Sequence, residues 1–414
     1  MGRTAWRLLV VASLISTAAA ATRPHYGGTL RVQTRYRIVP ADLAFDTLVT
    51  FNDSAQPQPA LAASWKHDAD FKRWEFQLRT GVKFHDGTPL TAAAAAAALE
   101  KVGAFALTDT ALIIRPEQPA PKLLDTLAGL PIFKSRADGG RVGTGPFRIT
   151  TETAARAVFE ANEDYWGGRP YLDGVEIDTG RHPRDQLLAF DLSKADVVEI
   201  DFGDLRRISQ SGKRTWTSPP VDLIAVAFEP LVDLRVREAI ALSIGRSTIH
   251  SVLLQKQGVA TGAILPQWLS GYSFLFPAER DLDKARQLGS GVGPVTIGYD
   301  PSDTTMRLIA ERIAVNAREA GITMRTTGGS RAAARIIRVG VNSPDRFQSL
   351  TSVGDTVGIK ANGSLYDVER TLLQGFRIVP LFHLPEIYGL AARVRGWAPS
   401  RWGGWKLDSV WLAP

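Results

Sequence analysis

The chain has 414 residues, of which 44% are hydrophobic and 22% charged, so it is long enough for two or more packed domains and is not dominated by disorder. It contains no cysteine, which excludes disulfides, thiolate metal sites and cysteine nucleophiles. The formal net charge of +7 comes from scattered lysines and arginines, which predicts a solvated surface and no nucleic-acid partner.

The first 21 residues have the pattern of a secretory signal peptide. Arg3 and Arg7 form a basic start, an apolar run follows from Leu8 to Ile15, and small residues precede an expected cleavage site near Ala20 or Ala21. The apolar run is too short to span a bilayer. The absence of cysteine also removes the lipid-attachment residue of bacterial lipoproteins. We therefore expect a periplasmic protein that is secreted and not membrane-anchored.

The first elements of the mature chain are predicted to be strands and one helix. Residues 29–34 alternate in a way that predicts a strand, and Tyr36 follows its end. Residues 74–78 alternate again, with aromatic and leucine side chains on one side, as in a strand with one buried face. Asp86 and Gly87 form a turn, and Thr91 is the expected N-cap of an alanine helix over 92–98.

The middle of the chain contains a glycine-rich segment, residues 143–149, that could suggest a phosphate loop. No Lys-Ser/Thr pair follows it and no helix begins there, so we predict a tight turn into a strand. Further on, Asp233 is the expected cap of a helix.

Residues 294–327 predict a strand, a crossover helix and a second strand. Asp303 caps the helix and Gly321 ends it. Two strands joined by a helix in about 30 residues form a βαβ unit, which is normally parallel and right-handed. This part of the chain is therefore expected to be α/β.

Several stretches resemble, in chain order, the motifs of the family 5 extracellular solute-binding proteins, which are dipeptide, oligopeptide and nickel receptors of ATP-binding-cassette (ABC) importers. The similar segments are residues 59–65 (PALAASW), 78–92 (LRTGVKFHDGTPLTA), 143–147 (GTGPF), 160–173 (EANEDYWGGRPYLD), 234–240 (LRVREAI), 377–383 (RIVPLFH) and 394–397 (VRGW). One departure is Gly245, which stands where the family pattern has Asp.

The resemblance implies an α/β (mixed α+β) chain with a two-lobed periplasmic-binding-protein fold of type II, cluster C-like. Lobe I would comprise residues 22–227 and 391–414, including the smaller subdomain typical of the family. Lobe II would comprise residues 228–390 and be α/β. The hinge is expected near residues 227–229 and 388–391, with the ligand in the cleft between the lobes.

The function that this resemblance implies is that of a monomeric receptor. It would bind a peptide or similar small solute and deliver it, without chemical change or cofactor, to the membrane subunits of an ABC importer. Candidate ligand contacts are Tyr36, Trp268, Tyr272 and His383. The region 330–363 is shortened relative to the family and has no Trp or Tyr, so the cargo stays open between a peptide, a nickel chelate, a sugar or another solute.

Motifs for enzymatic chemistry are absent from the sequence. The six histidines, His25, His67, His85, His182, His250 and His383, lack the spacing of a metal site. No nucleophile elbow, Walker loop or dinucleotide fingerprint occurs. We therefore expect no catalytic residues and no metal ligands. Two alternatives remain: an orphan ligand sensor or binding module for a signalling partner, and, with less support, a secreted hydrolase.

Overall fold

The computed structural model describes residues 23–35, 40–137, 139–272, 275–276, 278–329 and 331–414. The predicted signal segment, residues 1–21, and Tyr36 lie outside these ranges. In the part of the chain that is described, no helix is both long and apolar enough to cross a membrane.

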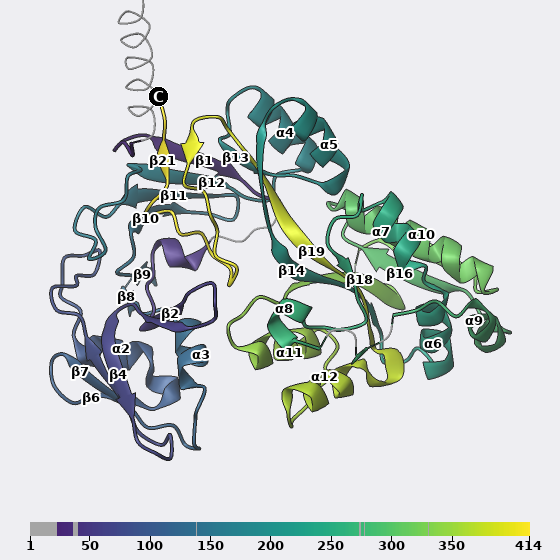
Figure 1. The fold of residues 1–414 in the computed structure, drawn as a ribbon, viewed down its shortest axis with the longest axis horizontal. Coiled ribbons are helices and arrows are strands. Elements are labelled where there is room, and N and C mark those ends of the chain that lie inside the picture. Colours follow the sequence, from purple (N-terminus) through teal and green to yellow (C-terminus); the bar gives the residue numbers. More distant parts are fainter. Residues whose placement is uncertain (1–22, 36–39, 138, 273–274, 277, 330) are drawn as a thin grey trace, which may run out of the picture.

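An 11-stranded sheet runs through two lobes, in the order β10-β11-β12-β1-β13-β19-β14-β18-β16-β17, with β15 paired beside this path to β19 (Figure 1). The strands in lobe I are β10 (Phe147–Glu152), β11 (Arg156–Ala161), β12 (Gly174–Asp178), β1 (Thr29–Gln33) and β13 (Val197–Glu199). Those in lobe II are β18 (Ala334–Gly340), β16 (Val295–Tyr299), β17 (Met324–Gly328) and β15 (Val259–Ala260).

Two long strands connect the lobes, β14 (Arg214–Phe228) and β19 (Ile378–Leu390), and they pair with each other in antiparallel fashion. Near Leu390, β19 also pairs with β13 of lobe I, whereas residues 222–228 of β14 pair with β18 of lobe II. Nearly every residue of β19 is buried, because both of its faces are covered. The chain therefore crosses between the lobes twice within one sheet.

Helices cover this sheet. Lobe II carries α6 (Leu234–Ser243), α7 (Arg246–Val252), α8 (Gln267–Ser270), α9 (Leu282–Gly289), α10 (Thr304–Glu319), α11 (Arg346–Asp355) and α12 (Leu365–Leu373). Beside the crossing strands lie α4 (Pro183–Asp191) and α5 (Phe202–Gln210), and their apolar side chains belong to the same core cluster as those of α10. The predicted βαβ unit is confirmed, because β16 and β17 pair in parallel and the Asp303 side chain accepts from the Met306 amide at 3.0 Å.

A small subdomain extends from lobe I and has its own core (Figure 1). Its sheet has the order β4-β5-β7-β6, formed by β4 (Ala62–His67), β5 (Trp74–Leu78), β7 (Ala111–Ile114) and β6 (Ala104–Ala106). Its remaining elements are α2 (Ala92–Ala98), α3 (Leu123–Ala128), β8 (Lys134–Ser135) and β9 (Arg141–Val142), and the hairpin β2 (Val49–Phe51) and β3 (Pro57–Pro59) lies next to it. The predicted strand, turn and helix are confirmed: Trp74, Phe76 and Leu78 are buried in β5, Gly87 has a φ of +82°, and α2 spans Ala92–Ala98.

The Thr91 cap gives a test of this local structure. Its hydroxyl accepts from the Ala94 amide at 3.2 Å and satisfies one of the free donors at the start of α2. Thr91→Ala is therefore expected to lower the free energy of unfolding by about 1 kcal/mol in urea titrations. Thr91→Ser keeps a hydroxyl at this position and serves as the matched control. Equal losses in the two variants would contradict a capping role.

The C-terminal segment returns to lobe I, where β20 (Val394–Arg395) pairs with β21 (Trp411–Leu412). Trp397, Trp405 and Trp411 are buried in this segment. Trp402 is only partly buried, because its loop reaches into the space between the lobes.

Candidate functional site

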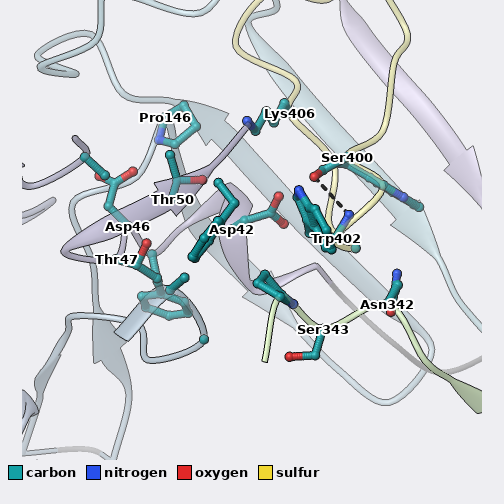
Figure 2. A pocket seen from close by; sticks show the side chains of 18 of the residues that line it. Asp42, Asp46, Thr47, Thr50, Pro146, Asn342, Ser343, Ser400, Trp402 and Lys406 are labelled. Carbon is teal, nitrogen blue, oxygen red and sulfur yellow. Dashed lines mark hydrogen bonds between the residues drawn. The ribbon is translucent and has the colours of Figure 1, made fainter. Parts of the chain in front are cut away.

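A cavity of about 550 Å³ lies between the lobes, and we call it the cleft cavity (Figure 2). One wall comes from residues 42–60, from Pro146, Tyr165 and Trp166, and from the C-terminal loop 400–408. The opposite wall comes from lobe II, residues 340–352. Its aromatic lining residues are Phe45, Phe51, Tyr165, Trp166, Trp402 and Trp405. A cavity of this size with mixed aromatic and polar walls is typical of a small-molecule site.

Asp46 is the most heavily bonded carboxylate of the lobe I wall. It accepts hydrogen bonds from the Thr144 hydroxyl at 2.8 Å, the Trp166 indole at 2.9 Å and the Tyr165 hydroxyl at 3.3 Å. Burial raises the pKa of Asp46, and these three donors act against that rise. The donors come from the segments 143–149 and 160–173, so both motifs build this wall.

Asp42 belongs to the 3₁₀ turn η1 (Ala41–Leu43) and also lines the cleft cavity. Burial raises its pKa to about 6, while the Trp405 amide and the Lys406 charge lower it. The Asp42 carboxylate packs directly against Gly404: a Cβ there would lie 2.3 Å from Oδ2. Gly404 has a φ of +77°, a backbone conformation that favours glycine. Glycine is therefore required here both by the backbone conformation and by the short distance to the Asp42 carboxylate.

The C-terminal loop joins the two lobes through Trp402. Its indole N–H donates to the Asn52 carbonyl at 2.9 Å, and its ring lies 6.4 Å from that of Phe51 in lobe I. On the other side the ring lies 5.5 Å from that of Trp268 in lobe II. The same loop therefore lines the cavity and contacts both of its walls.

Two further cavities adjoin the first near Gly403, with volumes of about 330 and 510 Å³. The smaller one contains an ionic cluster that connects the lobes. Arg35, after β1, pairs with Asp201 and, at 3.2 Å, with Asp303 at the start of α10. Arg338 on β18 donates to Asp222 on β14 at 2.7 Å. Glu386 lies beside this cluster, and burial raises its pKa to about 7.

The structure does not bring the predicted ligand contacts together in the cleft cavity. Tyr36 lies outside the described residues. Trp268 packs against the ring of Trp402, and its indole N–H donates to the Pro220 carbonyl at 2.9 Å. Tyr272 lies beside Glu369, in an aromatic cluster with Phe276 and Tyr366. His383 is 2% exposed, and its Nε2 lies 2.9 Å from the Ile264 carbonyl. None of the three described side chains is among the residues that line the three cavities, and their roles as ligand contacts stay predictions.

Sequence reasoning missed Asp42, Asp46 and Trp402 as cavity residues. The motifs that support Asp46 were visible, but its own segment, residues 40–48, carries no comparable pattern. Within the described ranges, no group of three or more His, Asp or Glu side chains could hold a metal ion.

Two lobes joined by two crossing strands, with a solute-sized cavity between them, define a two-lobed solute-binding protein. The model for "Bacterial extracellular solute-binding proteins, family 5 Middle" matches residues 56–113 and 100–342, so the chain belongs to this family. Its membership agrees with the prediction of a binding protein and not an enzyme.

Individual relatives agree with this assignment. The chain is 28% identical over 334 residues to the nickel-binding periplasmic protein of Escherichia coli (strain K12), and this match covers 69% of the chain and 64% of that protein. The chain thus spans just under two thirds of this relative.

Solved structures with 15% identity confirm the predicted two-lobed type II fold. The dipeptide-binding protein from Pseudoalteromonas sp. SM9913, in complex with Met-Leu, has a TM-score of 0.78 and coverage of 93% of this chain and 100% of its own. NikA from Staphylococcus aureus, in complex with Ni(L-His)2, has a TM-score of 0.77 and coverage of 91% and 97%.

Proposed function

We propose that this protein is the periplasmic solute receptor of an ABC importer. It binds a peptide or similar small solute in the cleft cavity and delivers it, chemically unchanged, to the membrane subunits. The observation that carries the proposal is the cavity of about 550 Å³ with one wall from each lobe. A solute that touches both walls binds the closed form better than an open form and shifts the population toward it. The relatives that bind a dipeptide and a nickel–histidine complex support a small solute.

The proposal includes an exported monomer without a lipid anchor, and the lobe division expected from the sequence, 22–227 with 391–414 against 228–390. Closure needs a place where the crossing strands bend. Besides the expected hinge near 227–229 and 388–391, the β14–β19 ladder is irregular between Thr217 and Asp222. Pro220 faces Pro385 there, and neither residue has an amide hydrogen to donate. Hydrogen exchange with and without solute would identify which segment responds.

A thermal-shift screen of the mature protein tests the binding part. Suitable probes are dipeptides to pentapeptides, the nickel–histidine complex and oligosaccharides. A solute at 100 times its dissociation constant should stabilise the protein by about 2.7 kcal/mol, so the melting temperature should rise with its concentration. The loaded receptor should then stimulate ATP hydrolysis by its importer in proteoliposomes. A receptor that binds a solute but leaves that rate unchanged would contradict delivery.

A blocking variant locates the site. Ser352 on α11 is exposed and lines the cleft cavity, so Ser352→Trp should fill part of it and weaken solute binding at least tenfold. Ser209 on α5 is also an exposed helical serine but lines none of the three cavities, which makes Ser209→Trp the matched control. Titration calorimetry compares the two. Equal affinities would place the solute elsewhere.

A further inference from the structure

Trp268 on α8 is a point where lobe II meets the C-terminal loop of lobe I. The Trp402 ring lies 5.5 Å from the Trp268 ring, at an angle of 57° between the ring planes. The Arg401 guanidinium lies 5.2 Å from the centroid of the same Trp268 ring. Two consecutive residues of the loop therefore contact a single indole of the opposite lobe.

The C-terminal loop is bonded to lobe I at the turn of the β2–β3 hairpin. The Trp402 indole donates to the Asn52 carbonyl and Nη1 of Arg401 donates to the Asp53 carbonyl, each at 2.9 Å. Within the loop, the Trp402 amide donates to the Ser400 hydroxyl at 3.2 Å, as Figure 2 shows. All of these bonds lie within lobe I, so the loop should stay with that lobe when the lobes separate.

Trp268 is held in place by lobe II and by a crossing strand. Its indole N–H donates to the Pro220 carbonyl on β14 at 2.9 Å, which fixes the plane of the ring. The segment before α8 is fixed by Glu369 on α12, whose carboxylate accepts from the amides of Ile264 and Leu265 at 2.6 and 3.0 Å. Lobe II therefore presents a pre-positioned ring to the loop, which lowers the entropy cost of the contact.

The position of Trp268 relative to the cavities separates its role from that of Trp402. Trp402 lines the cleft cavity, whereas Trp268 and Arg401 line none of the three adjoining cavities. A solute in the cleft cavity can therefore touch Trp402 without touching Trp268. Because Trp268 belongs to lobe II and the loop to lobe I, moving the lobes apart must break the aromatic pair and the contact between the cation and the ring.

We propose that Trp268 is the anchor on lobe II that holds the C-terminal loop when the lobes close, and that it stabilises the closed form without contacting the solute. This inference rests on the proposed receptor function, because it concerns the closed form that binds the solute. Trp268 is then a positioning residue that acts on the solute through Trp402. Its removal shifts the population toward the open form and weakens the binding of every solute by the same factor.

Trp268→Leu tests the proposal in the mature protein, because it removes the ring and keeps an apolar side chain. Titration calorimetry measures its affinity for Met-Leu, the nickel–histidine complex and any further solute from the screen. We expect a loss of about tenfold for each solute, because an aromatic pair and a cation–π contact together account for about that factor. Trp268→Phe keeps an aromatic face and should lose less. Unchanged affinity in Trp268→Leu, or a changed preference between two solutes, would overturn the inference.

Trp65→Leu is the matched control for the loss of a tryptophan. Trp65 is also partly buried, but it lies on β4 in the small subdomain and lines none of the three cavities. We expect this variant to bind the same solutes with wild-type affinity. A loss equal to that of Trp268→Leu would mean that affinity follows general stability, and the inference would fail.

Arg401→Gln tests the same contact from lobe I, since it removes the cation and leaves Trp402 in the cavity wall. We expect its affinity to fall by about threefold, as for a partly exposed cation–π contact. In the double variant with Trp268→Leu, Arg401→Gln should cause no further loss, because the ring is already absent. Additive losses would contradict a shared contact. If Trp268→Leu does not fold, unchanged affinity in Arg401→Gln overturns the inference.

Distances between spin labels report the closure itself. The chain has no cysteine, so labels attach only at Glu117→Cys in lobe I and Lys360→Cys in lobe II, both at exposed positions. At a solute concentration that half-saturates the wild-type protein, Trp268→Leu should show a smaller population at the short distance.

Contrary outcomes separate the two proposals. Identical distance distributions in the wild-type protein and Trp268→Leu would overturn the inference and leave the receptor function intact. If the wild-type protein binds none of the probes and the screen yields no solute, the receptor function fails, and the anchor role of Trp268 fails with it.

Discussion

Replacing Gly143 with alanine is expected to lower the free energy of unfolding by about 3 kcal/mol, with loss of solute binding at the same time. A Cβ at position 143 would lie 1.9 Å from the Ala44 carbonyl oxygen and 2.5 Å from Cδ1 of Phe45. Ala44 is buried and its carbonyl accepts from the Gly145 amide at 3.0 Å, so the backbone cannot move aside without breaking contacts. The displaced segment carries Asp42 and Asp46, which is why binding should fail with stability.

The matched control is Gly203→Ala on α5. Nothing lies within 4 Å of a Cβ at Gly203, and alanine is a better helix former than glycine, so stability should stay the same or rise by up to about 1 kcal/mol. Urea unfolding at pH 7.5 compares the two variants. Equal midpoints would contradict the close approach of the two backbones at Gly143.

Local patterns in the sequence were sufficient for those elements that depend on neighbouring residues. The alternation over 74–78, the Thr91 cap and the βαβ unit at 294–327 all appear in the structure, because each depends on side-chain period, capping and turn chemistry within a few residues. The prediction that the glycine-rich segment at 143 leads into a strand is confirmed, because β10 begins at Phe147. Gly143 and Gly145 are also required because a Cβ at either position would overlap the backbone of Ala44. The sequence could not reveal this contact, since Ala44 is about 100 residues away in the chain.

The candidate site depends on contacts over similar or longer separations. Asp46 meets Thr144 across 98 positions and Trp166 across 120, and Trp402 meets Asn52 across 350. Such contacts follow from the tertiary fold and leave no spacing pattern. His383 illustrates the limit within one strand: β19 is buried on both faces, so period-2 alternation could not tell whether the ring faces the cleft or the core.

The burial of His383 leads to a pH-dependent stability. Burial lowers the pKa of His383 to about 4, whereas the unfolded chain has a value near 6.5. Between these two pH values the unfolded state binds the proton and the folded state does not. The contribution of His383 to the free energy of unfolding is therefore complete above pH 6.5 and is lost as the pH falls toward 4. The full loss corresponds to about 3 kcal/mol.

Asp42 and Glu386 have raised pKa values in the folded state, so their effect on the pH dependence of the free energy of unfolding is opposite to that of His383. Both carboxyls stabilise the folded state less as the pH rises. The effect of His383 is therefore isolated by comparison with His383→Gln, whose uncharged amide can still donate to the Ile264 carbonyl. Urea unfolding from pH 4 to pH 8 should show the wild-type protein losing about 3 kcal/mol relative to this variant as the pH falls through the window. Parallel stability profiles would mean that His383 titrates normally and is not enclosed by the core.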